Sequence, residues 1–504
     1  MNVLSGGYAE LNRRGFIGAV SGMAALSVPA VRAAAAPALK IGVLSDIHVS
    51  SPKDADIFEK ALRRYRAEGV DGVLIAGDLG TDGRIAELEA VAATWFKVFP
   101  DDRGEDGRHV ERLFLLGNHD VCGLCYRLPE LKDRLDSQEL KDEWFCLDRA
   151  RHWERLFHER YEPIFLKEVK GYRFVLRNWI SERHGDRDEL PGFLAAHGDR
   201  LKGDRPFFFA QHPHPKGTCC QSWTDGGVPW MDCSDDGRST RLLSAYPNCI
   251  ALSGHSHTTL TDEHSIWQGD FTSIGCGCLR GYAFTFPGRE NGHAHDDFRQ
   301  TTPRPQTMTW LGFTESKQGM LMEVHGDRIV LHRHEFRRDR PLGDDWIVPL
   351  PAPGARPYAF ASRRKAAAAH PPQFGADAQV TVTERRMHDR ARVLQDMVRV
   401  DFPAIPSRGG ALRAFEFAVR AETRVGDCVR TLVEKRVYSP GMLLPEEFDC
   451  DGAFCTFAKA ELPLGRDVRF VVTPLDCWGN GGAPLASGWR RCKQPSTPAK
   501  SFAT

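Results

Sequence analysis

Largely apolar runs alternate with helical patterns through the first two-thirds of the chain. The runs Leu39–Ser45 and Val70–Ala76 are typical of strands that are covered on both faces of a parallel sheet. Ile57–Arg66 and Ile85–Phe99 have apolar residues at helical spacing. Further buried strands are predicted at Arg112–Leu116, Tyr172–Leu176, Pro206–Ala210 and Cys249–Leu252. This strand–helix alternation predicts an α/β domain.

Alternating patterns close this domain and return near the end of the chain. Gly319–Val324 and Arg328–Arg333 alternate on either side of His325-Gly326-Asp327, which predicts a hairpin. Phe415–Ala421 and Asp467–Thr473 are predicted strands of a small β-sandwich. A stretch rich in Pro, Ala and Arg between these regions predicts a linker. We therefore expect an α/β domain at 37–345, a linker at 346–377, an accessory β-sandwich at 378–490 and a tail at 491–504.

The first 36 residues have the pattern of an export signal. Arg13-Arg14 precede a short stretch rich in Ala, Gly and Ser, and small residues follow Val31. This resembles a twin-arginine signal, although Asn12 stands where Ser or Thr is usual and Gly18 where Lys is common. It implies the twin-arginine translocase as a partner and a periplasmic or secreted protein. A general secretory signal or a single membrane anchor are alternatives, and the short apolar stretch disfavours the anchor.

Composition narrows the class of protein. Among 504 residues, 67 basic and 67 acidic side chains cancel, so no global charge attracts nucleic acid or an anionic membrane. A hydrophobic content of 41% excludes wholesale disorder, collagen and coiled coil. Because no 20-residue apolar run follows the N-terminus, no stable membrane span is expected. The 14 cysteines are too sparse for a disulfide scaffold, although export would allow some to oxidise.

Side chains of metal-ligand type follow the predicted strands in five places. In chain order these are Asp46-x-His48, Gly77-Asp78, Gly117-Asn118-His119-Asp120, His212 and Gly254-His255-Ser256-His257. Carboxylate, imidazole and amide oxygen together suit borderline divalent ions. In an extended segment, residues two apart point the same way, and open α/β sheets bind ligands at the carboxyl ends of their strands. Seven candidate ligands would serve two metal ions about 3.5–4 Å apart.

Five such fragments in this order resemble the calcineurin-like metallophosphoesterase family, whose motifs are D-x-H, G-D, G-N-H-[DE], H and G-H-x-H. The resemblance covers residues about 40 to 335 and implies an α/β fold, a four-layer αββα sandwich. It also implies two divalent transition-metal ions, of Mn, Fe or Zn. The first would be held by Asp46, His48, Asp78 and His257, and the second by the bridging Asp78 with Asn118, His212 and His255.

The same resemblance implies a phosphoric-ester hydrolase in which a metal-bridging hydroxide attacks phosphorus. His119 would protonate the leaving oxygen or stabilise the transition state, and Asp120 would orient His119. Thr81 stands where purple acid phosphatases have an iron-binding tyrosine, so no purple ferric centre is expected. The Gly-Asp-Leu and Gly-Asn-His-Asp forms are closer to the cyclic-nucleotide phosphodiesterase branch, which favours phosphodiesters over phosphomonoesters.

Some neighbouring residues leave alternatives open. His214 lies two residues after His212, faces the same way in an extended segment and could replace it as a ligand. Cys122-x-x-Cys125 has no second pair at zinc-finger spacing, which indicates a disulfide or two inert thiols. The same interpretation applies to the pairs Cys219-Cys220 and Cys276-x-Cys278.

Two loops beside the metal-bearing strands carry aromatic and Arg side chains. They contain Trp223 and Trp230 in the first loop, and Arg280, Tyr282, Phe284, Phe286 and Arg289 in the second. These side chains could stack on or clamp a substrate, or they could pack against one another. His293 and His295 are expected to be ordinary loop residues.

The end of the chain raises a rival hypothesis. Arg469–Val472 and the following Leu475-Asp476-x-x-Gly479-Asn480 resemble the last strand and turn of a fibronectin type III-like module. The protein could then be a surface-binding protein that uses its β-sandwich, with the first domain as a non-catalytic scaffold. The seven converging polar groups argue against this, because they are costly to bury without metal.

Overall fold

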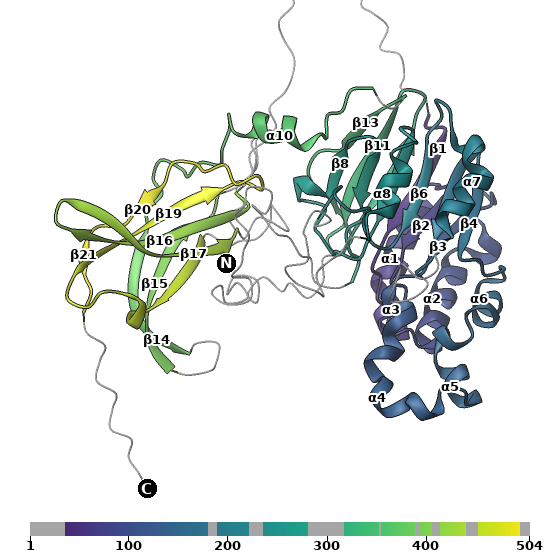
Figure 1. Cartoon of the computed structure of the whole chain (residues 1–504), viewed down its shortest axis with the longest axis horizontal. Coiled ribbons are helices and arrows are strands. Elements are labelled where there is room, and N and C mark those ends of the chain that lie inside the picture. Colours follow the sequence, from purple (N-terminus) through teal and green to yellow (C-terminus); the bar gives the residue numbers. More distant parts are fainter. Residues whose placement is uncertain are drawn as a thin grey trace, which may run out of the picture. The chain divides into compact units, whose positions relative to one another are not determined.

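The structure, a computed structural model, describes eight stretches of the chain (Figure 1). They are residues 36–179, 189–220, 235–280, 317–351, 354–388, 394–405, 414–439 and 452–493. The chain divides into Met1–Ala36 and Pro37–Thr504, and the predicted export signal lies outside the described residues apart from Ala36. Of the loop positions named above, only Arg280 is described. Within the described stretches, no helix has the length and apolar character needed to cross a membrane.

The first sheet orders its strands β12-β11-β10-β1-β2-β3, with β13 also pairing with β11. These strands are β1 (Leu39–Leu44), β2 (Gly72–Ala76), β3 (Glu111–Leu115), β10 (Gln318–Val324), β11 (Arg328–Glu335), β12 (Arg340–Pro341) and β13 (Trp346–Pro349). The three early strands are parallel, and β10 returns antiparallel to β1. The predicted β10–β11 hairpin is confirmed.

The second sheet has the order β4-β5-β6-β7-β9-β8. Its strands are β4 (Ile164–Val169), β5 (Tyr172–Arg177), β6 (Phe207–Gln211), β7 (Cys249–Ser253), β8 (Ile266–Gln268) and β9 (Thr272–Gly275). From β5 to β9 the pairs are parallel, so their carboxyl ends lie along one edge. Only β5, β6 and β7 were predicted, because β4, β8 and β9 lack a long apolar run.

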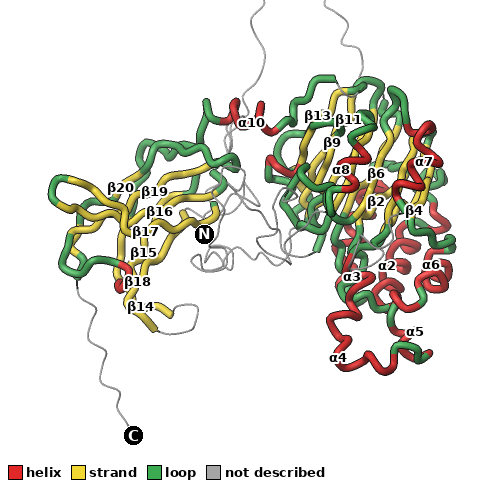
Figure 2. Tube along the Cα trace, viewed as in Figure 1, coloured by secondary structure: helices red, strands yellow, loops and turns green. Residues whose placement is uncertain are grey.

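Alternation along these strands builds the layers of the domain (Figures 1 and 2). Val175 and Phe209 face α7 (Leu190–Leu201) and α8 (Arg238–Leu243) in one core. Their neighbours Phe174 and Phe208 join a larger core, since successive strand residues face opposite sides. That core includes the first sheet together with α1 (Asp56–Ala67) and α2 (Ile85–Val98). The predicted αββα sandwich is confirmed.

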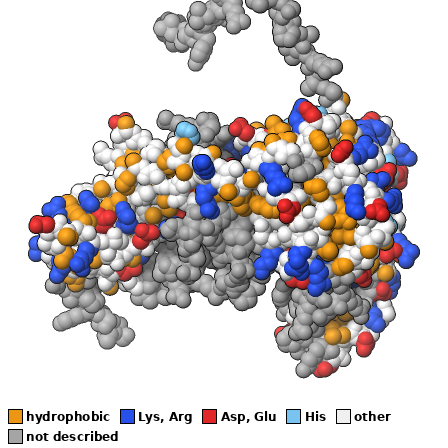
Figure 3. All heavy atoms as spheres, turned by 45° about the horizontal axis from the view of Figure 1, so that its top comes forward, with side chains coloured by type: hydrophobic (Ala, Val, Ile, Leu, Met, Phe, Trp, Pro, Cys, Tyr) orange, Lys and Arg blue, Asp and Glu red, His pale blue; other side chains and the backbone are white. Residues whose placement is uncertain are grey.

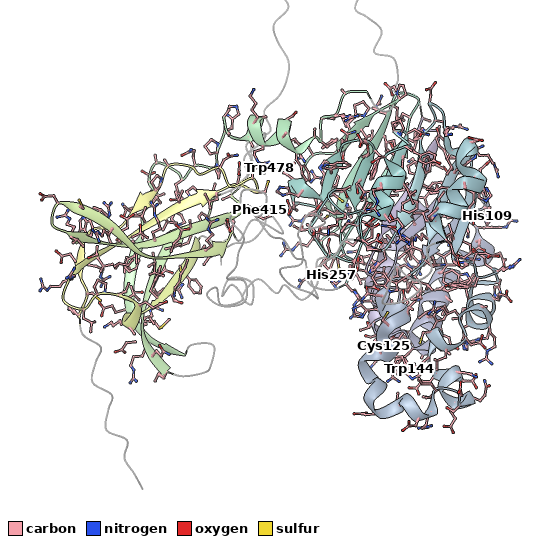
Figure 4. All side chains as sticks on the ribbon, in the orientation of Figure 1. His109, Cys125, Trp144, His257, Phe415 and Trp478 are labelled. Carbon is pink, nitrogen blue, oxygen red and sulfur yellow. The ribbon has the colours of Figure 1, made fainter. Side chains whose placement is uncertain are left out.

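Short helices fill the connection between β3 and β4. They are α3 (Asn118–Cys122), α4 (Leu128–Leu131), α5 (Gln138–Glu143) and α6 (Arg149–Phe157). Trp144 at the end of α5 packs with Leu124 and Leu140 in a small cluster of its own, and Trp144 and Cys125 are labelled in Figure 4. Trp153 on α6 packs in the main core. This insertion ties β3 to the second sheet.

The C-terminal region is all antiparallel β. One sheet orders β14-β15-β18 and the other β17-β16-β19-β20, with β21 on β19. The strands are β14 (Thr381–His388), β15 (Leu394–Pro403), β16 (Glu416–Val425), β17 (Cys428–Tyr438), β18 (Gly452–Ala458), β19 (Asp467–Leu475), β20 (Leu485–Ala486) and β21 (Arg490–Arg491). Val400, Phe417 and Phe470 belong to its core. The predicted antiparallel β region is confirmed, whereas the fibronectin type III likeness stays a prediction.

The segment predicted as a linker is partly structured. Its first residues, 346–349, form β13, because Trp346 and Val348 turn inward against β11. Helix α10 (Phe360–Ala367) follows. Neither β13 nor α10 was predicted, because the segment is rich in Pro and was interpreted as a linker. Basic and acidic side chains are interspersed on the described surface in Figure 3, in keeping with the cancelled net charge.

Tyr65 on α1 connects the two halves of the first sheet. Its hydroxyl donates to the Val43 carbonyl or the Met320 carbonyl, at 3.1 and 2.9 Å, on β1 and β10. The side chain is buried, and burial raises the pKa of its phenol. Gly42 makes room for the ring, since a Cβ there would lie 2.4 Å from it.

We predict that Tyr65→Phe lowers the free energy of unfolding by about 1–3 kcal/mol, because a buried polar contact is lost. Urea denaturation checks this. Tyr172→Phe is the matched control, because the Tyr172 ring is also buried and its contacts with Phe208 and Arg205 are made by the ring. Equal losses in both variants would contradict a role for the Tyr65 hydroxyl.

Candidate metal centre

The seven predicted ligands come together at the carboxyl ends of strands from both sheets. On the first sheet, Asp46 and His48 follow β1, Asp78 follows β2, and Asn118 begins α3 after β3. On the second sheet, His212 follows β6, and His255 and His257 follow β7. Because the two sheets are stacked, their strand ends face the same space. His257 is labelled in Figure 4.

One group of ligand atoms consists of Asp46, His48, Asp78 and His257. His257 Nε2 lies 3.0 Å from Asp46 Oδ1 and 3.2 Å from His48 Nε2. His48 Nε2 is in turn 3.7 Å from Asp78 Oδ2. Imidazole nitrogens and carboxylate oxygens thus point at one another around a common point.

A second group consists of Asp78, His212 and His255. His212 Nε2 lies 3.1 Å from Asp78 Oδ2 and 3.1 Å from the side-chain oxygen of Asn118. The His212 and His255 rings are 4.9 Å apart. Asp78 belongs to both groups, so its carboxylate lies between them.

The backbone of these loops is unusual. Asp46, His48 and Asp78 have φ angles of 51°, 41° and 52°, in the left-handed region that side chains other than Gly seldom adopt. His255 and His257 share it, at 65° and 50°. The ligands two apart therefore converge through left-handed turns and not, as the sequence suggested, through an extended segment. Such strain clusters at functional sites.

Two motif glycines allow the loops to approach closely. A Cβ on Gly77 would lie 2.3 Å from the His212 ring, and one on Gly117 would lie 2.1 Å from Asp78 Oδ1. Gly77 also has a φ of 93°. No larger residue fits at either position without moving a candidate ligand.

The imidazoles of the site differ in the direction of their pKa shifts. Burial lowers the pKa of His48 and of His255 to about 3, which keeps both rings neutral and able to act as ligands. Burial opposes protonation of His212, but the Asp78 and Asp46 charges prevail and raise its pKa to about 9. Burial disfavours the Asp46 carboxylate, yet His257 and His212 lower its pKa to about 2.

Comparison with known proteins gives the family of this region. A family model described as calcineurin-like phosphoesterase matches residues 39–259. These residues form a calcineurin-like phosphoesterase domain. No curated protein matches the chain.

Three solved structures are among those to which part of the chain is similar. A dimetal phosphatase from Danio rerio has 13% identity and a TM-score of 0.33 over 62% of this chain and 99% of its own. A predicted phosphoesterase from Streptococcus pneumoniae has 13% identity and a TM-score of 0.25 over 62% and 97%. GAP50, the anchor in the inner membrane complex of Plasmodium, has 11% identity and a TM-score of 0.32 over 64% and 91%.

The calcineurin-like domain is that of a metal-dependent phosphoesterase, and its residues fit divalent metal ions. Carboxylates, neutral imidazoles and an amide oxygen are the donors that borderline divalent ions prefer. His48 Nε2 and His257 Nε2 are 3.2 Å apart. Their lone pairs would face each other unless a proton or a cation lay between the two nitrogens. The geometry therefore suits a bound cation.

His119 is held differently from the prediction. Its Nδ1 lies 2.5 Å from the Thr81 carbonyl oxygen, and its backbone N–H donates to Asp78 Oδ1 at 2.9 Å. Asp120 was expected to orient the His119 ring. Instead its buried carboxylate accepts from the backbone N–H groups of Leu79, Gly80 and Gly117, at 3.1, 2.7 and 2.9 Å.

Asp120 thus connects the loop after β2 with the loop after β3. Burial, with the nearby Asp78 charge, raises its pKa to about 7. The sequence could not distinguish this bracing role from a contact with His119, because both follow from adjacent positions in one motif.

His214 lies apart from the metal centre. Its Nε2 is 2.8 Å from Ser256 Oγ and its Nδ1 is 3.4 Å from Cys219 Sγ. The structure therefore groups His212, and not His214, with Asp78. It also places Cys219 against an imidazole, where the sequence indicated a disulfide or inert thiols.

Three further residues contact the centre. The Cys278 side chain interacts with His257 and helps to raise the pKa of that imidazole. The Trp179 ring lies 5.5 Å from the His255 ring. Arg280, for which the sequence left open a substrate contact or packing within its loop, donates to the His48 carbonyl at 3.1 Å. Trp179 was missed because it belongs to no motif, and Cys278 was interpreted as part of a disulfide or as an inert thiol. The position of Trp179 just after β5 was the available signal.

We predict that Gly117→Ala lowers metal content and costs roughly 1–3 kcal/mol of stability, as overpacking does, because its methyl group would meet Asp78. Metal analysis of the purified protein and thermal unfolding check this. Gly326→Ala is the control, since a Cβ there meets nothing within 4 Å. Unchanged metal content in Gly117→Ala would contradict the close fit.

Proposed function

We propose that the calcineurin-like domain binds two divalent transition-metal ions, of Mn, Fe or Zn, and hydrolyses phosphoric esters, with phosphodiesters preferred. The observation that supports two ions is the position of Asp78, which belongs to both ligand groups. A carboxylate shared in this way is typical of dinuclear sites, where two ions stand about 3.5–4 Å apart.

The proposed ligand sets follow the two groups. One ion would be held by Asp46, His48, Asp78 and His257, and the other by Asp78, Asn118, His212 and His255. When bound, such ions neutralise charge on the phosphoryl oxygens and make water a better nucleophile at neutral pH. The protein's part is to hold seven donors in place before the substrate arrives.

His119 is the proposed proton donor to the leaving oxygen. With Nδ1 fixed on the Thr81 carbonyl, its Nε2 is the atom that can carry a proton toward the substrate. The ring stands edge-on to the His48 ring, with centroids 4.8 Å apart, so it lies beside the first ligand group. The hydrogen bond from the His119 backbone N–H to Asp78 Oδ1 fixes the position of the proposed proton donor relative to the shared carboxylate.

One feature supports a diester substrate. The Gly-Asp-Leu and Gly-Asn-His-Asp motifs resemble the cyclic-nucleotide phosphodiesterase branch. Arg280 places a guanidinium beside His48, where it can bind a phosphoryl oxygen of either ester class. A panel of phosphomonoesters, cyclic nucleotides, nucleic-acid diesters and lipid diesters with Mn(II), Fe(II) or Zn(II) tests the class. Faster turnover of monoesters than of all diesters would contradict the preference.

We propose further that residues 1–36 direct twin-arginine export, which carries folded proteins. That route suits a protein that must take up metal before it leaves the cytoplasm. The C-terminal β-sandwich is proposed to be an accessory domain of fibronectin type III-like kind.

We predict that Asp78→Asn removes most of the bound metal and nearly abolishes turnover. A direct shared ligand should matter more than residues around a metal site, whose loss typically costs about 10–100-fold in affinity. Metal analysis and phosphodiesterase assays measure both effects. The control is Asp327→Asn, because Asp327 lies in the β10–β11 turn with its side chain 74% exposed.

The result for the unchanged protein also decides between the two hypotheses of function. Two equivalents of metal that depend on Asp78 support the enzyme, whereas no metal at this centre would support the non-catalytic scaffold. An Asp78→Asn protein that keeps both of these metals and a near-normal rate would contradict the shared-ligand assignment.

We predict that His119→Ala keeps its metal but loses activity according to the leaving group. A nitrophenolate leaves without a proton, whereas an alkoxide needs one, and general acid help is worth about 10²–10⁴ in rate. Rates on esters of graded leaving-group pKa measure this. His109→Ala is the control, because His109 pairs with Glu111 at 3.0 Å and lies across the domain from His257 in Figure 4. An equal loss on every ester would remove the proton-donor role.

A further inference from the structure

A separate group of metal-type ligands includes a residue that is close in sequence to a ligand of the phosphoesterase centre. His214, Cys219 and Cys220 place one ligand atom each within 4.8 Å of the others. Their side chains are almost completely buried, with exposures of 0%, 0% and 1%. Neither Asp78 nor any other member of the two groups described above belongs to this cluster.

The His214 ring is oriented toward the thiols. Its Nε2 lies 2.8 Å from Ser256 Oγ, so Nδ1 faces Cys219 Sγ at 3.4 Å. Ser256 Oγ is itself held by Thr258, whose backbone N–H and hydroxyl lie 3.2 and 2.9 Å away. A histidine that binds metal through one nitrogen is usually held by a partner on the other.

The backbone turns both cysteines to the same side. Adjacent residues of an extended chain point to opposite faces, but Cys220 has a φ of 56°. Its backbone N–H donates to the His264 carbonyl at 2.7 Å, which holds this left-handed turn in place. Gly275 on β9 leaves room for the second thiol, since a Cβ there would lie 2.5 Å from Cys220 Sγ.

The donor chemistry differs from that of the phosphoesterase centre. Two sulfur atoms and one imidazole favour Zn²⁺ and other thiophilic ions, whereas carboxylates and imidazoles also accept Mn²⁺ and Fe²⁺. Three protein ligands leave a fourth position of a tetrahedral site. Ser273 Oγ lies 3.3 Å from Cys219 Sγ, which makes it a polar neighbour of that thiol.

We propose that His214 Nδ1, Cys219 Sγ and Cys220 Sγ form a third metal site, which takes a zinc-type divalent ion and is independent of the phosphoesterase centre. The site would join two loops that carry ligands of that centre. His214 lies two residues after His212, and its partner Ser256 lies between His255 and His257. An ion bound here would hold these two loops in place relative to each other.

Cobalt(II) is the probe that tests this site in the full-length protein, purified with reductant, stripped with a chelator and reloaded. Cobalt bound by sulfur gives an intense charge-transfer absorption in the near ultraviolet, which carboxylate and imidazole ligands do not give. We expect this band in the unchanged protein and in Asp78→Asn. In Cys219→Ala, Cys220→Ala and His214→Gln we expect the charge-transfer band to disappear. These variants should also bind one equivalent of metal less than the unchanged protein.

Cys249→Ala is the matched control, because Cys249 is an equally buried cysteine on β7 outside the cluster, and it should keep the band. The Asp78→Asn variant disables only the phosphoesterase centre. If the charge-transfer band remains in this variant, the third metal site exists whether or not the proposed function is correct. Absence of the band in the reduced, fully loaded protein would overturn the proposal, as would its survival in the Cys219→Ala, Cys220→Ala double variant.

A measurement without variants covers the case in which those proteins do not fold. X-ray absorption at the zinc edge of the stripped, unchanged protein, reloaded with zinc, should show sulfur neighbours at about 2.3 Å. A zinc spectrum with only nitrogen and oxygen neighbours in the fully loaded, reduced protein would overturn the proposal.

Discussion

The carboxylate of Asp78 lies where the strand ends of two stacked sheets meet, and most of the surrounding structure serves to keep it there. One oxygen accepts the His119 backbone N–H, and the other faces His212 from the second sheet. Parallel pairing of β2 with β3 brings the loops after both strands to the same edge. The Asp120 carboxylate then accepts hydrogen bonds from three backbone N–H groups of these two loops. The buried carboxyl group of Asp120 thereby positions the carboxylate of Asp78.

Neutral and charged groups are balanced around this point. Burial alone would favour neutral forms of every group, and it does so at His48 and His255. At His212 the carboxylates outweigh burial. The cost of enclosing these groups is the physical reason to expect cations among them, since buried charges in proteins are paired or bind metals.

Much of this arrangement could be predicted from sequence, because each ligand follows a recognisable apolar run. Asp46, Asp78 and His212 were placed at strand ends by pattern alone, and the αββα layers followed from the family resemblance. The left-handed turns at Asp46 and His48 were not predictable, since local preference opposes them and only the packed loops enforce them. The role of Asp120 was predicted incorrectly, and His214 was left as an alternative to His212, for a related reason. Neighbouring positions in a motif look equivalent until tertiary contacts, such as Ser256 for His214, separate them.

The hydroxyl of Tyr65 contacts a carbonyl 255 residues further along the chain, on β10. During synthesis, β1 therefore emerges from the ribosome with one edge unpaired and stays so until β10 has been made. An exposed strand edge is a template for pairing with other chains, and pairings between distant segments form slowly. A chain that stops before residue 318 would keep that edge open, so truncation products of this protein should aggregate, whereas loss of residues beyond the β10–β11 hairpin would spare the edge of β1.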